Sequence, residues 1–431
     1  MNIWGRVTID AFTFYFNGVK FVCDTALEIV KFIIWTLKGQ KMRKVTVGTF
    51  TTTPRMRELV NQALDNNRLS YGPMSRQFEQ EFAALHGCRF GVTSSSGTAS
   101  LRIALQTLKE LHGWRDGDEV IVPAVTFVAT VNVVLQCGLK PVLVDVERDF
   151  FGIDCLGARR AFDPKKARAI IPVHLFGHPC NMFDVERTAK DNSLAIVEDS
   201  CEAMFCSQHK RPVGSWGDIA AFSTYVAHLL STGVGGVATT NNPDYAAKMR
   251  SLVNHGRDGI YIAPEDSDVE GDQLREVVGR RFRFESVGWS ARMTELQAAL
   301  GLAQLETWQE MIANRRSNAR YLTDGLQQFE DRLQLPAVRL GATHSWMMYP
   351  LVLRDESKWP LVNWLEERGV ETREMLPLTN QPVYAGMFQE DDYPVAKWIN
   401  ESGFYTGIHQ DLTRGDLDRI IEGIGGYFSE H

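Results

Sequence analysis

Apolar and polar positions follow two different periods from residue 55 onward. Residues 55–66 and 76–86 have the spacing of amphipathic helices, and so does the segment 97–111. A short strand is predicted at 90–93, and short runs of Val, Ile and Leu without strict alternation lie at 119–122, 141–144, 169–172 and 194–197. Such runs are typical of strands in a parallel sheet that is covered on both faces. Because stretches of helical length separate them, the pattern predicts βαβ units.

The pattern changes in the last third of the chain. The apolar spacing predicts one long helix over residues 295–321, which leads into a smaller unit. That unit contains a predicted strand at 346–353, a helix at 358–368 and a terminal helix at 414–428. We therefore expect a large α/β domain over residues 44–310 and a small C-terminal α+β domain over residues 311–431.

The first 43 residues have a different character, so we treat them as an N-terminal extension. Residues 11–38 are rich in apolar and aromatic side chains, interrupted by Lys20, Asp24, Glu28 and Lys31. A membrane-spanning helix needs roughly 20 mostly uncharged residues, so we expect none here, and no signal-peptide cleavage site is evident. Two interpretations stay open: an amphipathic helix that docks on the body or on a partner, or an extension ahead of a natural start at Met42.

Composition narrows the class of protein. A hydrophobic content of 44% and a charged content of 23% are ordinary for a globular chain of 431 residues. The net charge of -7 argues against nonspecific binding of nucleic acid. The seven cysteines are scattered without a Cys-x-x-Cys pair, which indicates reduced thiols and a cytoplasmic protein.

Three segments that follow predicted strands carry candidate chemistry. The run 94–101, SSSGTASL, opens a helix, where a glycine and free N–H groups suit an anion, although serine-rich helix caps are common without one. The run 123–130, PAVTFVAT, has an aromatic residue just after a strand. The run 196–203, IVEDSCEA, ends a buried strand with two adjacent carboxylates, which are often simple caps.

These segments, taken with 222–236 (FSTYVAHLLSTGVGG) and 287–295 (VGWSARMTE), resemble the DegT/StrS family of sugar aminotransferases. The family is a branch of the fold-type I enzymes that use pyridoxal phosphate (PLP), and the resemblance extends from about residue 44 to 428. It implies a mostly parallel central sheet sandwiched by helices, with a smaller C-terminal α+β domain. It also implies a homodimer with shared active sites.

The resemblance assigns roles residue by residue. The backbone at Gly97 and Thr98 and the hydroxyl of Ser223 would hold the cofactor phosphate. Phe127 would stack on the pyridine ring, and Asp199 would keep the ring nitrogen protonated so that the ring accepts electrons. Glu202 replaces the usual Gln or His near the ring hydroxyl, and Ser290 replaces an Asn that reaches the partner subunit's cofactor phosphate.

The main departure is His228, which stands where the family has the lysine that forms the Schiff base. A lysine amine with a pKa of about 10.4 forms imines, whereas an imidazole titrates near 6.5 and does not. A subset of the family has His at this position: 3-dehydratases that remove the C3 hydroxyl of nucleotide-linked 4-keto sugars. The resemblance implies pyridoxamine phosphate (PMP) or PLP as cofactor, His228 as general base, a nucleotide-linked 4-keto-6-deoxy sugar as substrate and L-glutamate as amino donor.

One branch of such dehydratases uses an iron–sulfur cluster with four cysteine ligands. Cys201 stands where the first ligand would be, but no cysteine follows Cys206. We therefore expect no metal and no iron–sulfur cluster. The segment Tyr405 to Gln410 has two interpretations. It either approaches the active site, or His409 within it simply caps a turn. We favour the second interpretation.

Two other functions stay open. Loss of the lysine is also expected of a noncatalytic, ligand-binding or regulatory paralogue. The chain could instead be an aminotransferase in which position 228 is engineered or another lysine substitutes. From residue 210 onward, however, the lysines are Lys210, Lys248, Lys358 and Lys397, and none lies in the loop.

Overall fold

The computed structural model describes residues 12–16, 19–23, 44–258, 270–376 and 378–431. It divides into two units, Met1–Lys44 and Val45–His431. In the first unit, β1 (Phe12–Phe16) pairs antiparallel with β2 (Val19–Cys23). An amphipathic helix was one of the two interpretations of this segment, but these residues form strands. Aromatic and β-branched side chains favour extended backbone. The remainder of the extension lies outside the described residues, and the domain boundaries stay a prediction.

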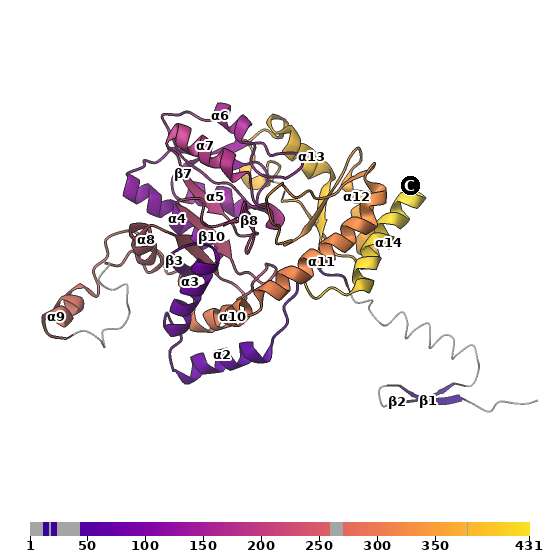
Figure 1. The fold of residues 1–431 in the computed structure, drawn as a ribbon, viewed down its shortest axis with the longest axis horizontal. Helices are drawn as coiled ribbons and strands as arrows, with labels where there is room; N and C mark the ends of the chain where they lie inside the picture. The colour runs from indigo at the N-terminus through magenta and orange to yellow at the C-terminus, as the bar shows by residue number, and fades with distance from the viewer. Residues whose placement is uncertain (1–11, 17–18, 24–43, 259–269, 377) are drawn as a thin grey trace, which may run out of the picture. The chain divides into compact units, whose positions relative to one another are not determined.

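The second unit is built on a sheet that helices surround (Figure 1). The sheet has seven strands in the order β3-β11-β10-β7-β6-β4-β5. The strands are β3 (Phe90–Ser94), β4 (Glu119–Pro123), β5 (Lys140–Val144), β6 (Ala167–Ile170), β7 (Ala195–Asp199), β10 (Ile219–Ser223) and β11 (Gly236–Thr240). Neighbours from β10 to β5 pair in parallel, and β11 is antiparallel to both β10 and β3. The predicted mostly parallel sheet is confirmed.

Helices cover both faces of this sheet, which explains why its strands lack strict alternation. They are α3 (Pro73–Leu85), α4 (Gly97–His112), α5 (Val128–Gln136), α6 (Cys155–Ala161), α7 (Met182–Asn192) and α8 (Pro243–Val253). Along β4, Val120 and Val122 belong to the core cluster that contains α4 and α5 residues. Ile121 between them belongs to the cluster on the other face, with residues of α6 and α7. Successive residues therefore enter opposite cores.

The predicted long helix is two helices, and the expectation of one was wrong. The first, α10 (Glu295–Leu305), contacts α2 (Pro54–Asp65) and α3, whereas the second, α11 (Trp308–Leu326), contacts α14 (Arg414–Glu430). Thr307 between them has φ -127°, outside the helical region. α10 packs in one core cluster, whereas α11 begins in that cluster with Ile312 and continues into the core of the C-terminal lobe. The apolar spacing continues through the break without marking it.

The C-terminal lobe contains a second sheet with the order β12-β13-β15-β14. Its strands are β12 (Leu333–Gln334), β13 (Tyr349–Leu353), β14 (Thr372–Glu374) and β15 (Gly403–Thr406), all paired antiparallel. α12 (Lys358–Glu367) and α13 (Pro394–Ser402) complete the lobe, and α9 (Gly271–Arg280) and the β8–β9 pair (Ser207–Gln208, Arg211–Pro212) lie in connections. β13 begins three residues later than predicted, because Trp346 has a positive φ of 54° that ends extended backbone. No helix among the described residues is long and apolar enough to cross a membrane.

Candidate active site

A cavity of about 400 Å³ lies at the edge of the large sheet where β4, β7 and β10 end. Parallel strands bring their carboxyl ends to one edge, which is where ligands bind in open α/β sheets. Seven of the residues singled out in the sequence line this cavity: Gly97, Thr98, Phe127, Asp199, Glu202, Ser223 and His228. Residues from four chain segments therefore meet in one place.

One end of the cavity is suited to a phosphate. Helix α4 begins at Gly97, and its N-cap Ser96 accepts a hydrogen bond from the Ala99 N–H at 3.1 Å. The first N–H groups of a helix have no acceptor within it and point toward incoming anions. A Cβ at Gly97 would lie 2.6 Å from the Cβ of Ser223, so only glycine lets the helix start this close to the end of β10.

Asp199 ends β7 at the floor of the cavity with 4% of its surface exposed. Its Oδ2 accepts a hydrogen bond from the Thr130 hydroxyl at 2.8 Å, and its Oδ1 accepts one from the Cys201 N–H at 3.2 Å. Burial raises its pKa above the ordinary value, because these bonds do not fully replace water. No ion pair reaches this carboxylate in the described part of the chain. A protonated ring nitrogen would supply the missing cation.

The adjacent carboxylate, Glu198, faces away from the cavity and has a structural role. It accepts hydrogen bonds from His174 Nε2 at 3.1 Å and from the Gly214, Trp216 and Gly217 N–H groups at 2.7–2.8 Å. Burial acts to raise its pKa, but these bonds outweigh burial and the pKa is lowered. Successive side chains of a strand point to opposite faces of the sheet, so Glu198 and Asp199 are separated although they are adjacent in the sequence.

Two further side chains approach the place of a cofactor ring. Phe127 has 57% of its surface exposed although it lines the cavity, so its ring is available for stacking. Glu202 Oε2 accepts a hydrogen bond from the Phe176 N–H at 2.9 Å. Burial, reinforced by the nearby charge of Asp199 and opposed by that bond, raises the pKa of Glu202 to about 7. This carboxyl therefore changes its charge near neutral pH.

His228 lies on the loop between β10 and β11, with its Nδ1 3.2 Å from the carbonyl oxygen of Ser223. A carbonyl only accepts, so Nδ1 carries the proton and Nε2 is the unprotonated nitrogen. Burial lowers the pKa of His228 to about 4, although hydrogen bonds to the backbone carbonyls of Ser223 and Cys201 act to raise it. The imidazole is therefore neutral at pH 7. Its pKa lies below the ordinary value near 6.5 that the sequence suggested.

The apolar residues beside His228 fall into two groups. Leu229 and Leu230 are buried in the main core, where each stabilises the fold by about 1.5–3 kcal/mol. Tyr225 is half exposed and lines the cavity, with its ring edge-on to the imidazole at 6.0 Å. The loop is closed by backbone hydrogen bonds from Val226 to Gly233 at 3.0 Å and from Thr232 to Thr224 at 2.9 Å. Core packing thus fixes the loop that presents the histidine.

Ser290 is exposed and does not line the cavity of its own chain. Its Oγ accepts a hydrogen bond from Arg292 at 3.4 Å. This placement leaves its predicted role at the partner subunit's site as a prediction. Within the described ranges, no group of three His, Cys, Asp or Glu side chains is arranged to hold a metal ion.

Several residues of the site were missed by sequence reasoning. Thr130 fixes Asp199, and its hydroxyl also lies 2.7 Å from that of Thr126; the spacing of four residues between these threonines is the one signal that could have shown it. Met347 and Met348 enter from the C-terminal lobe. Tyr405 also lines the cavity, so the start of the segment 405–410 does approach the site, contrary to the interpretation that we favoured. His409 does not line the cavity; its Nε2 lies 3.3 Å from the Thr46 hydroxyl, in keeping with the structural interpretation.

Comparison with known proteins identifies the family. The model of the DegT/DnrJ/EryC1/StrS aminotransferase family matches residues 51–425. The chain belongs to this family. It is 33% identical over 370 residues to a GDP-perosamine synthase of Caulobacter vibrioides, covering 85% of this chain and 93% of that one. It is 30% identical over 393 residues to a dTDP-4-dehydro-2,6-dideoxy-D-glucose 3-dehydratase of Saccharopolyspora spinosa, covering 86% and 84%.

A solved structure extends the likeness to the fold. The E. coli GDP-4-keto-6-deoxy-D-mannose-3-dehydratase, with bound hydrated PLP, superposes with a TM-score of 0.80 at 23% identity, covering 89% of this chain and 100% of that one. The fold-type I architecture predicted from the sequence is confirmed. The cofactor predicted from the sequence is the one that this neighbour holds. This protein is therefore a member of a PLP-dependent, sugar-modifying enzyme family.

Proposed function

We propose that this protein is a PMP- or PLP-dependent 3-dehydratase that removes the C3 hydroxyl of a nucleotide-linked 4-keto-6-deoxy sugar, with L-glutamate regenerating PMP. The observation that carries the proposal is a neutral histidine, His228, in the same cavity as the carboxylate Asp199. Among the described residues, no lysine lines this cavity. The names of the two relatives, a GDP-sugar synthase and a dTDP-sugar 3-dehydratase, support the nucleotide-linked substrate.

The residues present fit the cofactor. The start of α4 and Ser223 would hold its phosphate, Phe127 would stack on its ring, and Asp199 would pair with its ring nitrogen. When bound, PMP supplies an amine that combines with the sugar ketone and a ring that accepts electrons from the neighbouring carbon. Asp199 fulfils its part only as a carboxylate, and a cationic partner lowers the pKa that burial raises.

His228 would move the proton. Its Nδ1 is occupied by the Ser223 carbonyl, so Nε2 would take a proton from carbon and pass it to the departing C3 hydroxyl, which leaves as water. The lowered pKa makes the imidazolium a strong acid, which favours this second transfer. The free thiols found among the described cysteines support a reducing, cytoplasmic setting. A homodimer, in which Ser290 serves the partner's site, is part of the proposal.

Mass spectrometry of products tests the function. Purified protein is incubated with PMP, L-glutamate and a panel of nucleotide-linked 4-keto-6-deoxy sugars. We expect a product that lacks one oxygen atom. A product in which the ketone has become an amine would instead make the protein an aminotransferase, and no product in a sample that binds PMP would favour a noncatalytic role.

A lysine replacement tests the place of the loop. A His228→Lys variant should form a covalent link to PLP that borohydride makes permanent, because a lysine there lies in the cofactor cavity. The link is measured as a mass increase on the peptide that contains residue 228. Its absence, in a variant that binds PLP, would mean that the loop does not reach the cofactor.

A further inference from the structure

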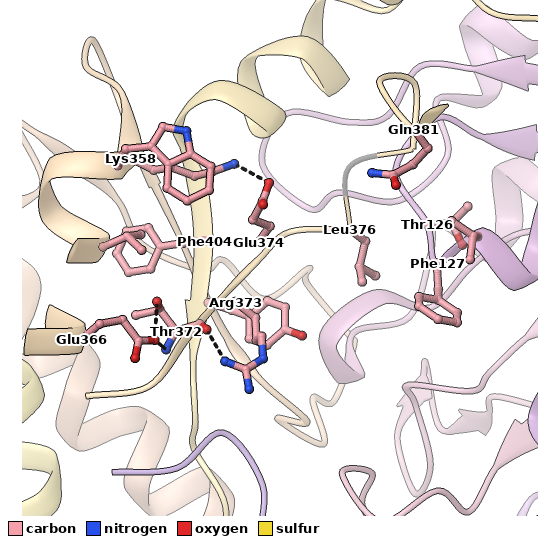
Figure 2. A pocket seen from close by; sticks show the side chains of 14 residues that line it. Thr126, Phe127, Lys358, Glu366, Thr372, Arg373, Glu374, Leu376, Gln381 and Phe404 are labelled. Carbon is pink, nitrogen blue, oxygen red and sulfur yellow. Dashed lines mark hydrogen bonds and ion pairs between the residues drawn. The ribbon is translucent and has the colours of Figure 1, made fainter. Parts of the chain in front are cut away.

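A second cavity, of about 480 Å³, adjoins the cofactor cavity (Figure 2). Four residues line both: Thr126, Phe127, Leu376 and Tyr405. The other walls come from the C-terminal lobe, from α12, the edge strand β14 and the start of β15. We call this cavity the lobe pocket. A ligand whose reacting end lies at the cofactor can extend past Phe127 into the lobe pocket.

The lobe pocket offers flat apolar surfaces. Trp359, at the start of α12, has 50% of its surface exposed, and Phe127 on the opposite side has 57%. Val362 also lines the pocket and adds apolar surface. Large aromatic side chains exposed in a concave site are typical of binding sites for planar rings, because stacking removes their surfaces from water.

The cations of the lobe pocket are already neutralised. Lys358 is 1% exposed, and its Nζ lies 3.0 Å from Glu374 Oε2 and donates to the Asn400 carbonyl. Arg373 donates to the Thr372 carbonyl at 2.7 Å and pairs with Glu371. Because each cation has a carboxylate partner, the pocket has little attraction for a phosphate or for the carboxylates of an amino acid.

The carboxylates of the lobe pocket, in contrast, have acceptor capacity to spare. Glu366 accepts both the N–H and the hydroxyl of Thr372 on Oε1, at 2.6 and 3.0 Å. Glu374 accepts Lys358 on Oε2. Among the described residues, no hydrogen bond reaches Oε2 of Glu366 or Oε1 of Glu374. Each carboxylate is thus held by one oxygen and can accept donors from a ligand on the other.

We propose that the lobe pocket binds the base of the nucleotide-linked sugar and prefers guanine. Guanine carries adjacent N–H donors at N1 and N2, which the free Oε2 of Glu366 can accept, and a flat ring that can stack on Trp359. Thymine and uracil carry one N–H between two carbonyls, which a carboxylate repels. The inference rests on the proposed function for the sugar part of the ligand.

Calorimetric titration of the PMP-loaded protein with GDP and with dTDP tests the preference. We expect GDP to bind at least tenfold more tightly than dTDP, and a Glu366→Gln variant to lose most of this difference. The amide of Gln still accepts from Thr372, so the variant should fold. Glu367→Gln, at the exposed neighbouring position, is the matched control and should bind GDP as the wild type does. Equal binding of GDP and dTDP would overturn the proposal.

Stacking has its own test. Trp359→Ala should weaken GDP binding about tenfold, whereas Trp359→Phe should keep most of the affinity because a ring remains. GDP binding that neither Glu366→Gln nor Trp359→Ala changes would place the base elsewhere. Displacement of GDP by L-glutamate would assign the pocket to the amino donor instead.

The two proposals fail separately. Selective GDP binding that depends on Glu366, without loss of oxygen from any sugar, would contradict the dehydratase reaction and leave the base pocket standing. Dehydratase turnover together with equal binding of GDP and dTDP would support the proposed reaction and contradict the guanine preference of the lobe pocket.

Discussion

The two sides of the cofactor cavity are built differently. On the sheet side, Asp199 and the start of α4 are fixed at the ends of central elements, and both carboxylate oxygens of Asp199 have hydrogen-bond donors. On the loop side, His228 is held through backbone carbonyls, with Nδ1 3.2 Å from that of Ser223, and two buried leucines hold its loop. In the proposed function, the sheet side holds the cofactor, and the loop side supplies the proton-transferring group that selects the reaction.

The largest effect is expected on the sheet side, from Asp199→Asn. An amide of the same shape cannot neutralise a protonated ring nitrogen, so turnover should fall by about 10²–10³-fold or more and PMP should bind more weakly. Cofactor fluorescence gives the affinity, and product formation gives the rate. Asp116→Asn, at an exposed position outside the cavity, is the control. Unchanged PMP affinity and rate would mean that Asp199 does not meet the ring.

Glu202 lines the same cavity, and its titration should make the stability of the folded protein depend on pH. Its folded pKa of about 7 exceeds its ordinary value of 4.5, so its contribution to stability is fully present below about pH 4.5 and is lost as the pH rises to about 7. In Glu202→Gln that loss should disappear, which stabilises the cofactor-free protein at pH 8 by at most about 3 kcal/mol. Denaturant unfolding at pH 5 and pH 8 measures the difference. A constant difference between wild type and variant at both values would contradict the assignment.

A smaller effect is expected from Thr130→Val, which removes the hydroxyl that donates to Asp199. The loss of one hydrogen bond to a charged group costs about 1.5–3 kcal/mol in stability or cofactor binding. Thr130→Ser keeps the donor and should retain most of the PMP affinity. If Thr130→Ser binds PMP as weakly as Thr130→Val, packing of the methyl group matters more than the hydrogen bond.

The sheet side could largely be predicted from the sequence. Gly97, Asp199 and Ser223 lie at ends of strands or at the start of a helix, and a parallel sheet brings such positions together. The residues alone do not choose between Glu198 and Asp199, because the choice depends on which face of β7 the cavity occupies. Only the family resemblance selected Asp199. Tyr405 lies about 200 residues from Asp199 in the sequence, and only tertiary packing brings it to the cavity.

The loop side could be predicted only in part. The position of His228 followed from the motif, but the lowered pKa depends on burial, which no local pattern reports. The break between α10 and α11 was missed for a similar reason: the apolar spacing is continuous, and only tertiary packing turns α11 from the core that it shares with α10 toward the core of the C-terminal lobe.

The most direct test of the account is a single-turnover comparison of PMP-loaded wild type and His228→Asn with the same keto sugar. Asparagine fits the position but cannot take up a proton. The account predicts that His228→Asn binds PMP as the wild type does and loses oxygen from the sugar about 10²–10⁴-fold more slowly. Above pH 5 the wild-type rate should show no loss from protonation of His228, because its pKa is about 4. A His228→Asn variant that turns over at the wild-type rate would contradict the account.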